Sequence, residues 1–175
     1  MSQVRFIGCL HFGHEWMAKH RGFQDSYYHD EHLIDYWNRT VHKKDLTYIL
    51  GDITMEKPDF YYKLTMLNGR KKVILGNHDK GKHIPELLKY VETVEGMEHY
   101  KGYWLTHCPV HPQELTFVHG NIHAHIHEMS IPESNIHVKY WDAERDIISA
   151  SGKGYYNVDA KLIDFKPKTI EELIQ

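Results

Sequence analysis

Three stretches of the sequence join a short apolar run to a glycine and then to polar residues that suit metal ions. In α/β sheets, ligands collect just beyond the carboxyl ends of the strands, and glycine lets the backbone turn tightly and approach a ligand. Each stretch alone is also typical of a hydrogen-bonded turn, so the interpretation depends on their occurring together. The three are Gly8-Cys9-Leu10-His11, Gly51-Asp52 and Gly76-Asn77-His78-Asp79.

Histidines extend this pattern along the chain. There are 16 of them, and imidazole is the commonest metal ligand in proteins. His107 follows an apolar, strand-like run, and His123, His125 and His127 alternate in a later segment. Alternate side chains of an extended chain share one face, so we expect several of these imidazoles to converge on a metal. Other histidines are interpreted as polar surface residues, among them His20, His29 and His83.

Taken in order, these residues resemble the calcineurin-like metallophosphoesterase superfamily. Its motifs run D-x-H, G-D, G-N-H-D, a histidine after a strand, and G-H-x-H, and the resemblance covers Cys9 to His127. The segments 11–14 and 155–159 are similar to small phage and bacterial members. The resemblance implies an α/β fold, a two-sheet β-sandwich flanked by helices, as a single domain of residues 1–175.

The resemblance also implies a centre of two divalent metal ions, with zinc, iron or manganese expected. It places Asp52 between the two ions. The last motif fits two alignments, one using Asn121 and His123 and the other His125 and His127. We favour the second, because it keeps both ligands at the expense of one methyl group, that of Ala124. The implied metal ligands are then Cys9, His11, Asp52, Asn77, His107, His125 and His127.

Cys9 departs from the family, which has aspartate at this position. One interpretation is a small buried hydrophobe at a strand end, where free cysteine is common. The other is a thiolate ligand, which favours softer ions such as zinc or iron(II) over magnesium. His11, two residues later, makes the ligand interpretation the better one. A damaging disulfide between Cys9 and Cys108 is a further hypothesis.

The implied activity is hydrolysis of phosphomonoesters or phosphodiesters, including nucleotides or cyclic nucleotides, by a hydroxide that bridges the metals. His78 is expected to protonate the leaving oxygen and Asp79 to orient His78. His14 and Arg21 are weaker candidates for contacts to the substrate phosphate, since guanidinium offers paired donors. Alternatives are a non-catalytic interaction scaffold of the same fold, or a nuclease.

Composition bounds the class of protein. A chain of 175 residues with 41% hydrophobic and 26% charged residues is ordinary for a soluble globular domain. No apolar run approaches the roughly 20 residues that cross a bilayer, and the start does not resemble a signal peptide.

The net charge of −3 disfavours loose binding to nucleic acid. Two cysteines cannot form a disulfide framework, so we expect a cytoplasmic protein of a bacterium or phage-infected host. The sequence gives no indication of an oligomeric state.

The positions of apolar residues predict strand–helix units first and strand-rich sequence afterwards. This order predicts parallel strands followed by a more antiparallel second half. Asp30 is the expected start of the first helix, after a polar loop over 11–29. Strands are expected over 4–9, 46–50, 72–75, 91–95, 102–106, 115–119, 136–141 and 155–163, and helices over 30–41, 58–67, 84–90 and 169–174.

Overall fold

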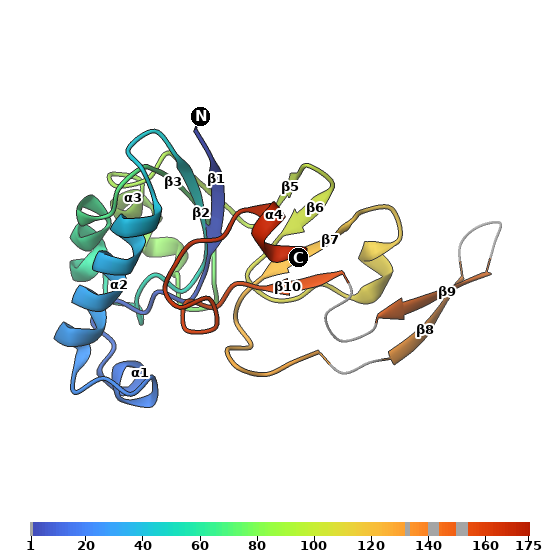
Figure 1. Ribbon diagram of the computed structural model, residues 1–175, viewed down its shortest axis with the longest axis horizontal. Helices are drawn as coiled ribbons and strands as arrows, with labels where there is room; N and C mark the ends of the chain where they lie inside the picture. The colour runs from blue at the N-terminus through green and yellow to red at the C-terminus, as the bar shows by residue number, and fades with distance from the viewer. Residues whose placement is uncertain (1, 132–133, 140–143, 150–153) are drawn as a thin grey trace.

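The computed structural model describes residues 2–131, 134–139, 144–149 and 154–175. Two four-stranded sheets lie side by side, with helices against the first and a two-stranded hairpin extending beyond the second (Figure 1). Buried side chains of both sheets belong to one hydrophobic cluster. The predicted α/β class, with two sheets flanked by helices, is therefore confirmed.

The first sheet has the order β1-β2-β3-β4, and all of its strands are parallel. Its inner strands are nearly continuous apolar runs because both faces of a parallel sheet are covered. The pairing register sets Ile7 opposite Ile49 and Leu50 opposite Ile74, so these strands end together. The residues that follow them therefore emerge at one edge. The strands are β1 (Val4–Ile7), β2 (Leu46–Leu50), β3 (Arg70–Ile74) and β4 (Thr93–Glu95).

The second sheet has the order β10-β7-β6-β5, and its pairing differs from the prediction. The pairs β10–β7 and β6–β7 are parallel, and only β5–β6 is antiparallel within this sheet. A parallel pair needs a long crossover, and the segment between β6 and β7 supplies it. The expected strand over 115–119 is wrong, because that crossover carries a 3₁₀ helix, Pro112–Leu115. The strands are β5 (Glu98–Tyr100), β6 (Tyr103–Leu105), β7 (Gly120–His123) and β10 (Tyr155–Asn157).

The hairpin consists of β8 (Ser134–Lys139) and β9 (Glu144–Ser149), which are antiparallel. The strand predicted over 136–141 overlaps β8, and its positions 140–141 lie outside the described residues. In Figure 1 the hairpin points away from both sheets.

The helices begin and end differently from the prediction. Asp25, whose side chain accepts a hydrogen bond from the Tyr28 amide at 3.0 Å, caps the long helix, so that helix starts before Asp30. The supposed loop before it contains a short helix, and the segment 58–67 forms a 3₁₀ helix. No helix among the described residues is long and apolar enough to cross a membrane. The helices are α1 (Glu15–His20), α2 (Ser26–Thr40), α3 (Ile84–Leu87) and α4 (Ile170–Leu173), with 3₁₀ helices at Pro58–Met66 and Gly81–His83.

Val158 joins the two sheets at their common edge. Its amide donates to the His123 carbonyl at 2.8 Å, and its own carbonyl accepts from the Gly8 amide at 2.9 Å. The expected strand over 155–163 therefore ends at Asn157, where the chain leaves β7 and crosses to the end of β1. This crossing brings the ends of β1 and β7 together.

Trp37 tests the packing of α2 on the first sheet. Its side chain is fully buried, and its indole N–H donates to the Asn68 carbonyl at 3.0 Å. Trp37→Ala leaves a large cavity and should lower the free energy of unfolding by about 3–5 kcal/mol, measured by urea denaturation. Tyr62→Ala, at a side chain 51% exposed, should change it by less than about 0.5 kcal/mol. Equal effects of the two variants would contradict this packing.

Candidate metal centre

The loops after β1 and β2 are joined by backbone hydrogen bonds. The Cys9 amide donates to the Gly51 carbonyl at 3.0 Å, and the His11 amide donates to the Asp52 carbonyl at 2.9 Å. Gly51 has φ +77°, and a Cβ there would lie 2.5 Å from the Gly76 nitrogen, so no side chain fits. These contacts explain why a glycine precedes the polar residues.

Several residues of these loops have backbone conformations that are unusual for side chains larger than glycine. Residues with positive φ outside glycine cost of order 1–3 kcal/mol each, and they persist where the surrounding structure enforces them. Such strain gathers at functional sites. The residues are Cys9 (54°), His11 (52°), Asp52 (54°), His125 (69°) and His127 (49°).

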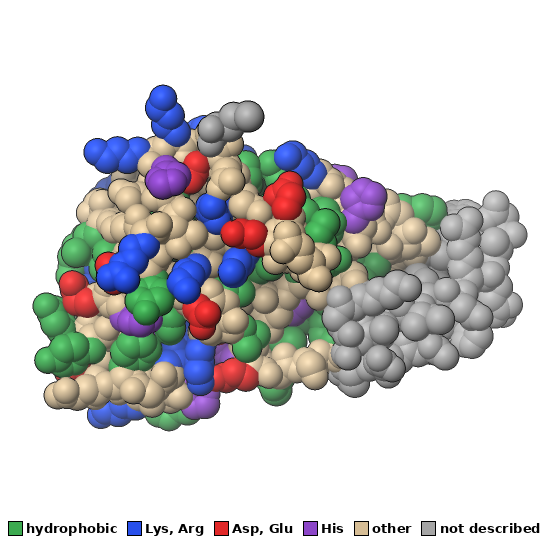
Figure 2. All heavy atoms as spheres, viewed as in Figure 1, with side chains coloured by type: hydrophobic (Ala, Val, Ile, Leu, Met, Phe, Trp, Pro, Cys, Tyr) green, Lys and Arg blue, Asp and Glu red, His purple; other side chains and the backbone are tan. Residues whose placement is uncertain are grey.

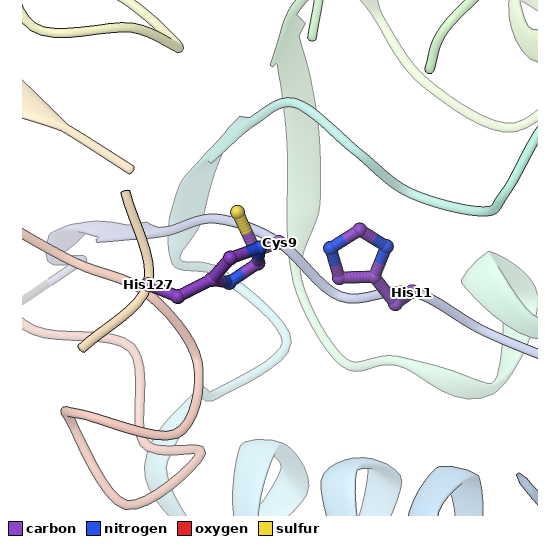
Figure 3. A group of neighbouring side chains, drawn as sticks. All are labelled: Cys9, His11 and His127. Atoms are coloured by element: carbon purple, nitrogen blue, oxygen red, sulfur yellow. The ribbon is translucent and has the colours of Figure 1, made fainter. Parts of the chain in front are cut away.

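Cys9, His11 and His127 form the first group of possible metal ligands (Figure 3). Each offers one atom, and these atoms lie within 4.8 Å of one another. Figure 3 shows Cys9 and His11 on the segment that follows β1, and His127 on a separate segment that brings its ring beside them. Within the described residues, neither ring nitrogen of His11 has a hydrogen-bond partner, although His11 is only 2% exposed. Burial, followed by the charge of Arg21, holds the pKa of His11 well below its usual value, so the ring is neutral with a free lone pair.

His107 organises the second group. Its Nδ1–H donates to the Leu50 carbonyl at 2.8 Å, which directs Nε2 toward the other side chains. That Nε2 lies 3.0 Å from Asn77 Oδ1, 3.1 Å from His125 Nδ1 and 3.4 Å from Asp52 Oδ2. Atoms that carry lone pairs thus face one another, and a proton or a metal cation must lie between them.

Asp52 lies between the two groups. Its Oδ2 is 3.9 Å from His11 Nε2 on one side and 3.4 Å from His107 Nε2 on the other. Burial by itself raises the pKa of Asp52, but the hydrogen bond and charge of His107 bring that pKa down to about 2. Burial likewise lowers the pKa of His107, but Asp52 outweighs it and leaves the pKa raised. The carboxylate is therefore ionised and able to bind cations.

The Cys9 thiol is fully buried and accepts a hydrogen bond from the His125 amide at 3.3 Å. Burial, with the charges of Asp159 and Asp52, raises the pKa of Cys9 well above its usual value. A thiolate at this position therefore needs a cation beside it. The sulfur, imidazole and oxygen donors together fit zinc or iron, and these groups of residues could hold metal ions.

Asp159 is part of the site, although no function was predicted for it from the sequence. Its Oδ2 accepts a hydrogen bond from His127 Nδ1 at 2.7 Å, which turns the other ring nitrogen toward Cys9 and His11. Carboxylates that orient a metal-binding histidine in this way are common around metal sites. The one signal in the sequence was its place in the segment 155–159, which resembles small phage and bacterial members.

The contacts of the Arg21 side chain differ from the expectation that it binds the substrate phosphate. Its side chain is 1% exposed, and its Nη2 donates to Asp159 Oδ2 at 3.1 Å and to the Cys9 carbonyl at 2.8 Å. Its Nη1 lies 3.0 Å from His29 Nε2. Because its donors are directed at protein groups beneath the cluster, Arg21 supports the loops instead of facing a substrate. His29, expected at the surface, is fully buried beside it.

Asp79 also differs from its expected function. Its carboxylate accepts from the amides of Asp52 at 2.8 Å, Gly76 at 2.9 Å and Ile53 at 3.3 Å. Within the described chain no hydrogen bond joins it to His78. Asp79 therefore ties together the loops after β2 and β3, because its neighbours' amides all point at it.

His78 and His14 flank the cluster. Their rings lie 6.1 Å and 5.6 Å from the ring of His11, centroid to centroid. The His78 side chain is 23% exposed, its amide donates to Asp52 Oδ1 at 3.0 Å, and its Nδ1 is 3.8 Å from Glu56 Oε1. Both histidines are thus partly exposed beside the cluster.

The structure brings His125 and His127 to the cluster, and it leaves Asn121 and His123 elsewhere. Asn121 is buried and bonds the backbone around it, including the Trp104 carbonyl at 3.0 Å. The expected extended chain ends at His123, where β7 stops. His125 and His127 converge because both have positive φ, not because they alternate along a strand.

Cys108 is exposed, and its sulfur lies within 4.8 Å of ligand atoms of His107 and His125. Cys9 and Cys108 are both free thiols, so the structure has no disulfide between them.

No family model matches the chain. An uncharacterized protein of Methanocaldococcus jannaschii is 29% identical over 182 residues, which cover 100% of this chain and 91% of that protein. The Gene 66 protein of Mycobacterium phage D29 is 42% identical over 84 residues, 46% of this chain and 42% of its own length. The chain thus matches less than half of the phage relative.

Among solved structures, a protein of unknown function from Aquifex aeolicus has a TM-score of 0.66 at 20% identity, covering 98% of this chain and 97% of its own. That likeness shows a shared fold. A nuclease of Pseudomonas putida and an archaeal phosphodiesterase give TM-scores of 0.46 and 0.43, at 19% and 13% identity. They cover 71% and 89% of this chain, and 61% and 81% of their own. These two scores are too low to argue a shared site.

Asp159 provides a test of the cluster that does not depend on activity. Asp159→Asn weakens the acceptor that orients His127, so affinity for zinc should fall by about 10–100-fold, measured by competition with a chromophoric chelator. Asp164→Asn, at an exposed carboxylate, is the matched control and should bind zinc as the unmodified chain does. Unchanged affinity in folded Asp159→Asn would remove His127 from the ligand set.

Proposed function

We propose that this chain is a dinuclear-metal-dependent phosphoesterase that hydrolyses phosphomonoesters or phosphodiesters. The observation that supports this most is the position of Asp52, an ionised carboxylate between two groups of side chains that could bind metal ions. A carboxylate in that position can be shared by two cations.

In this proposal, Cys9, His11 and His127 hold one ion. Asn77, His107 and His125 hold the other, and Asp52 contacts both. When bound, a pair of divalent ions lowers the pKa of water and neutralises phosphate charge. The soft sulfur of Cys9 favours zinc or iron, and manganese is the other ion expected for the pair.

The residues around the ions position the reacting groups. The His78 side chain is partly exposed beside the cluster, while its Nδ1 is buried and lies 3.8 Å from Glu56 Oε1, which leaves Nε2 as the nitrogen able to face a substrate. It can therefore give a proton to the oxygen that leaves phosphorus. Its amide is held by Asp52, whose own amide is held by Asp79. Asp79 thus positions His78 through the backbone and not by direct contact.

If His78 donates a proton to the leaving oxygen, replacing it should slow the hydrolysis of esters whose leaving group needs a proton more than that of esters whose leaving group is stable as an anion. The chain loaded with manganese, zinc or iron should hydrolyse bis-p-nitrophenyl phosphate, which liberates a stable anion. His78→Ala should slow hydrolysis of 3′,5′-cyclic AMP, whose alkoxide needs a proton, by about 10²–10⁴-fold. The nitrophenyl ester should be affected much less, and metal content by elemental analysis should not change.

His83→Ala is the matched control, because His83 is also half-buried but lies on the 3₁₀ helix beyond this motif. It should behave as the unmodified chain. Loss of metal in His78→Ala would refute the assignment of His78 as a proton donor. Inactivity with every metal and both substrates would favour a non-catalytic scaffold.

Cys9 should determine which metal occupies the first position. Cys9→Asp replaces a soft donor by a hard one, so the purified protein should gain manganese relative to zinc when both are supplied. Elemental analysis under reducing conditions measures the ratio. Cys108→Ser, at the exposed thiol, should shift the ratio less. An identical ratio in Cys9→Asp and the unmodified chain would exclude Cys9 as a ligand.

A further inference from the structure

A row of aromatic rings leads from the metal centre to the surface. The ring of His14 lies 5.6 Å from that of His11 and 6.4 Å from the indole of Trp16, between centroids. Trp16 in turn stacks on His20, with the rings 5.0 Å apart and 6° from parallel. The proposed phosphate site and an exposed indole are therefore separated by a single imidazole.

Trp16 is unusually open for so large an apolar side chain. It is 63% exposed although it belongs to α1, whose Met17 and Ala18 are buried. The His20 ring supports one of its faces, which holds the indole as a flat platform. Flat, exposed aromatic rings of this kind stack well on nucleobases, since every base has a π-face.

Both ends of α1 are attached to the metal centre. At its start, the His14 amide donates to the His11 carbonyl at 3.1 Å. At its end, His20 Nε2 lies 3.4 Å from Glu128 Oε2, and Glu128 follows His127 directly in the chain. These contacts fix the position of the indole relative to the cluster.

Positive charge lies on the same side of the site. Lys57 is exposed, and its Nζ donates to the Gly13 carbonyl at 3.3 Å, next to His14. Around Gly76-Asn77-His78-Asp79, by contrast, most basic residues have partners: Arg70 pairs with Glu92, Lys72 with Glu98 and Lys80 with Glu56, whereas Lys82 is exposed. On the face drawn in Figure 2, Lys and Arg side chains are likewise interspersed with Asp and Glu. The available charge suits one or two phosphates better than a long strand.

We propose that Trp16 is a base-stacking platform and that the substrate is a free nucleoside phosphate ester. This inference rests on the proposed function, because the metal centre must hold the phosphate while the base lies on Trp16. The platform would set the preference for a base-bearing ester over a plain sugar phosphate.

Calorimetric titration of the zinc-loaded protein with AMP and with ribose 5-phosphate tests the platform, with the His78→Ala substitution present in every variant so that the esters are not hydrolysed during the titration. The unmodified chain should bind AMP about ten- to a hundredfold more tightly, the usual effect of one stacked base. Trp16→Ala should bring this ratio close to one, and Trp16→Phe should give an intermediate ratio. Tyr27→Ala is the matched control: Tyr27 is also 63% exposed but contacts only the ring of Tyr28 among the described ring pairs.

A ratio in Trp16→Ala equal to that of the unmodified chain would overturn the platform. An equal fall in Tyr27→Ala would do the same. Titration with tetra-deoxyadenylate distinguishes a free nucleotide from a nucleic-acid strand. If Trp16→Ala weakened the binding of this strand and not that of AMP, the choice of a free nucleotide would be overturned. Binding of ribose 5-phosphate only after zinc loading would still support the phosphate site, so the two proposals fail separately.

Discussion

Around Asp52, oxygen, nitrogen and sulfur atoms that carry lone pairs face one another with too few hydrogens between them. His107 directs its Nε2 at the oxygens of Asn77 and Asp52, and His11 has two buried nitrogens without a described partner. Unsatisfied buried polar atoms are costly. Protons can relieve part of this, but burial opposes charge on His11 and on the Cys9 thiol. Metal cations would satisfy the lone pairs of these atoms together and leave only the N–H of His11 without a partner, and the proposed function depends on that constraint.

The fold sustains this arrangement by placing hydrogen-bonded supports beneath it. Asp79 gathers three backbone amides from the loops after β2 and β3. The buried pair of Arg21 and Asp159 holds the Cys9 carbonyl and the His127 ring. Strained backbone at Cys9, Asp52 and His127 is thus maintained by neighbours outside the proposed ligand set. Truncating one partner of such a buried pair leaves the other charge uncompensated, which is strongly destabilising.

Substrate choice would be decided above this cluster, on a different part of the chain. α1 is short, yet it connects His11 at one end with the segment after His127 at the other. A helix attached in this way places its exposed indole at a fixed distance from the phosphate. The same supports that stabilise the proposed metal ligands would therefore also align the base and the ester.

The sequence alone determined which kinds of side chain follow the strands of the first sheet. Apolar runs ending in glycine identify β1, β2 and β3, and in a parallel sheet such ends share an edge, so Cys9, Asp52 and Asn77 were predicted to meet. It did not predict the contacts of Asp79, Arg21 or Asp159, because most of their partners are distant in the chain and leave no periodic signal. Nor could it show that the second sheet is largely parallel, since the crossover over 106–119 contains no regular helical pattern. Only the tertiary structure decided these points, because hydrogen-bond partners, burial and ring stacking depend on contacts between segments far apart in sequence.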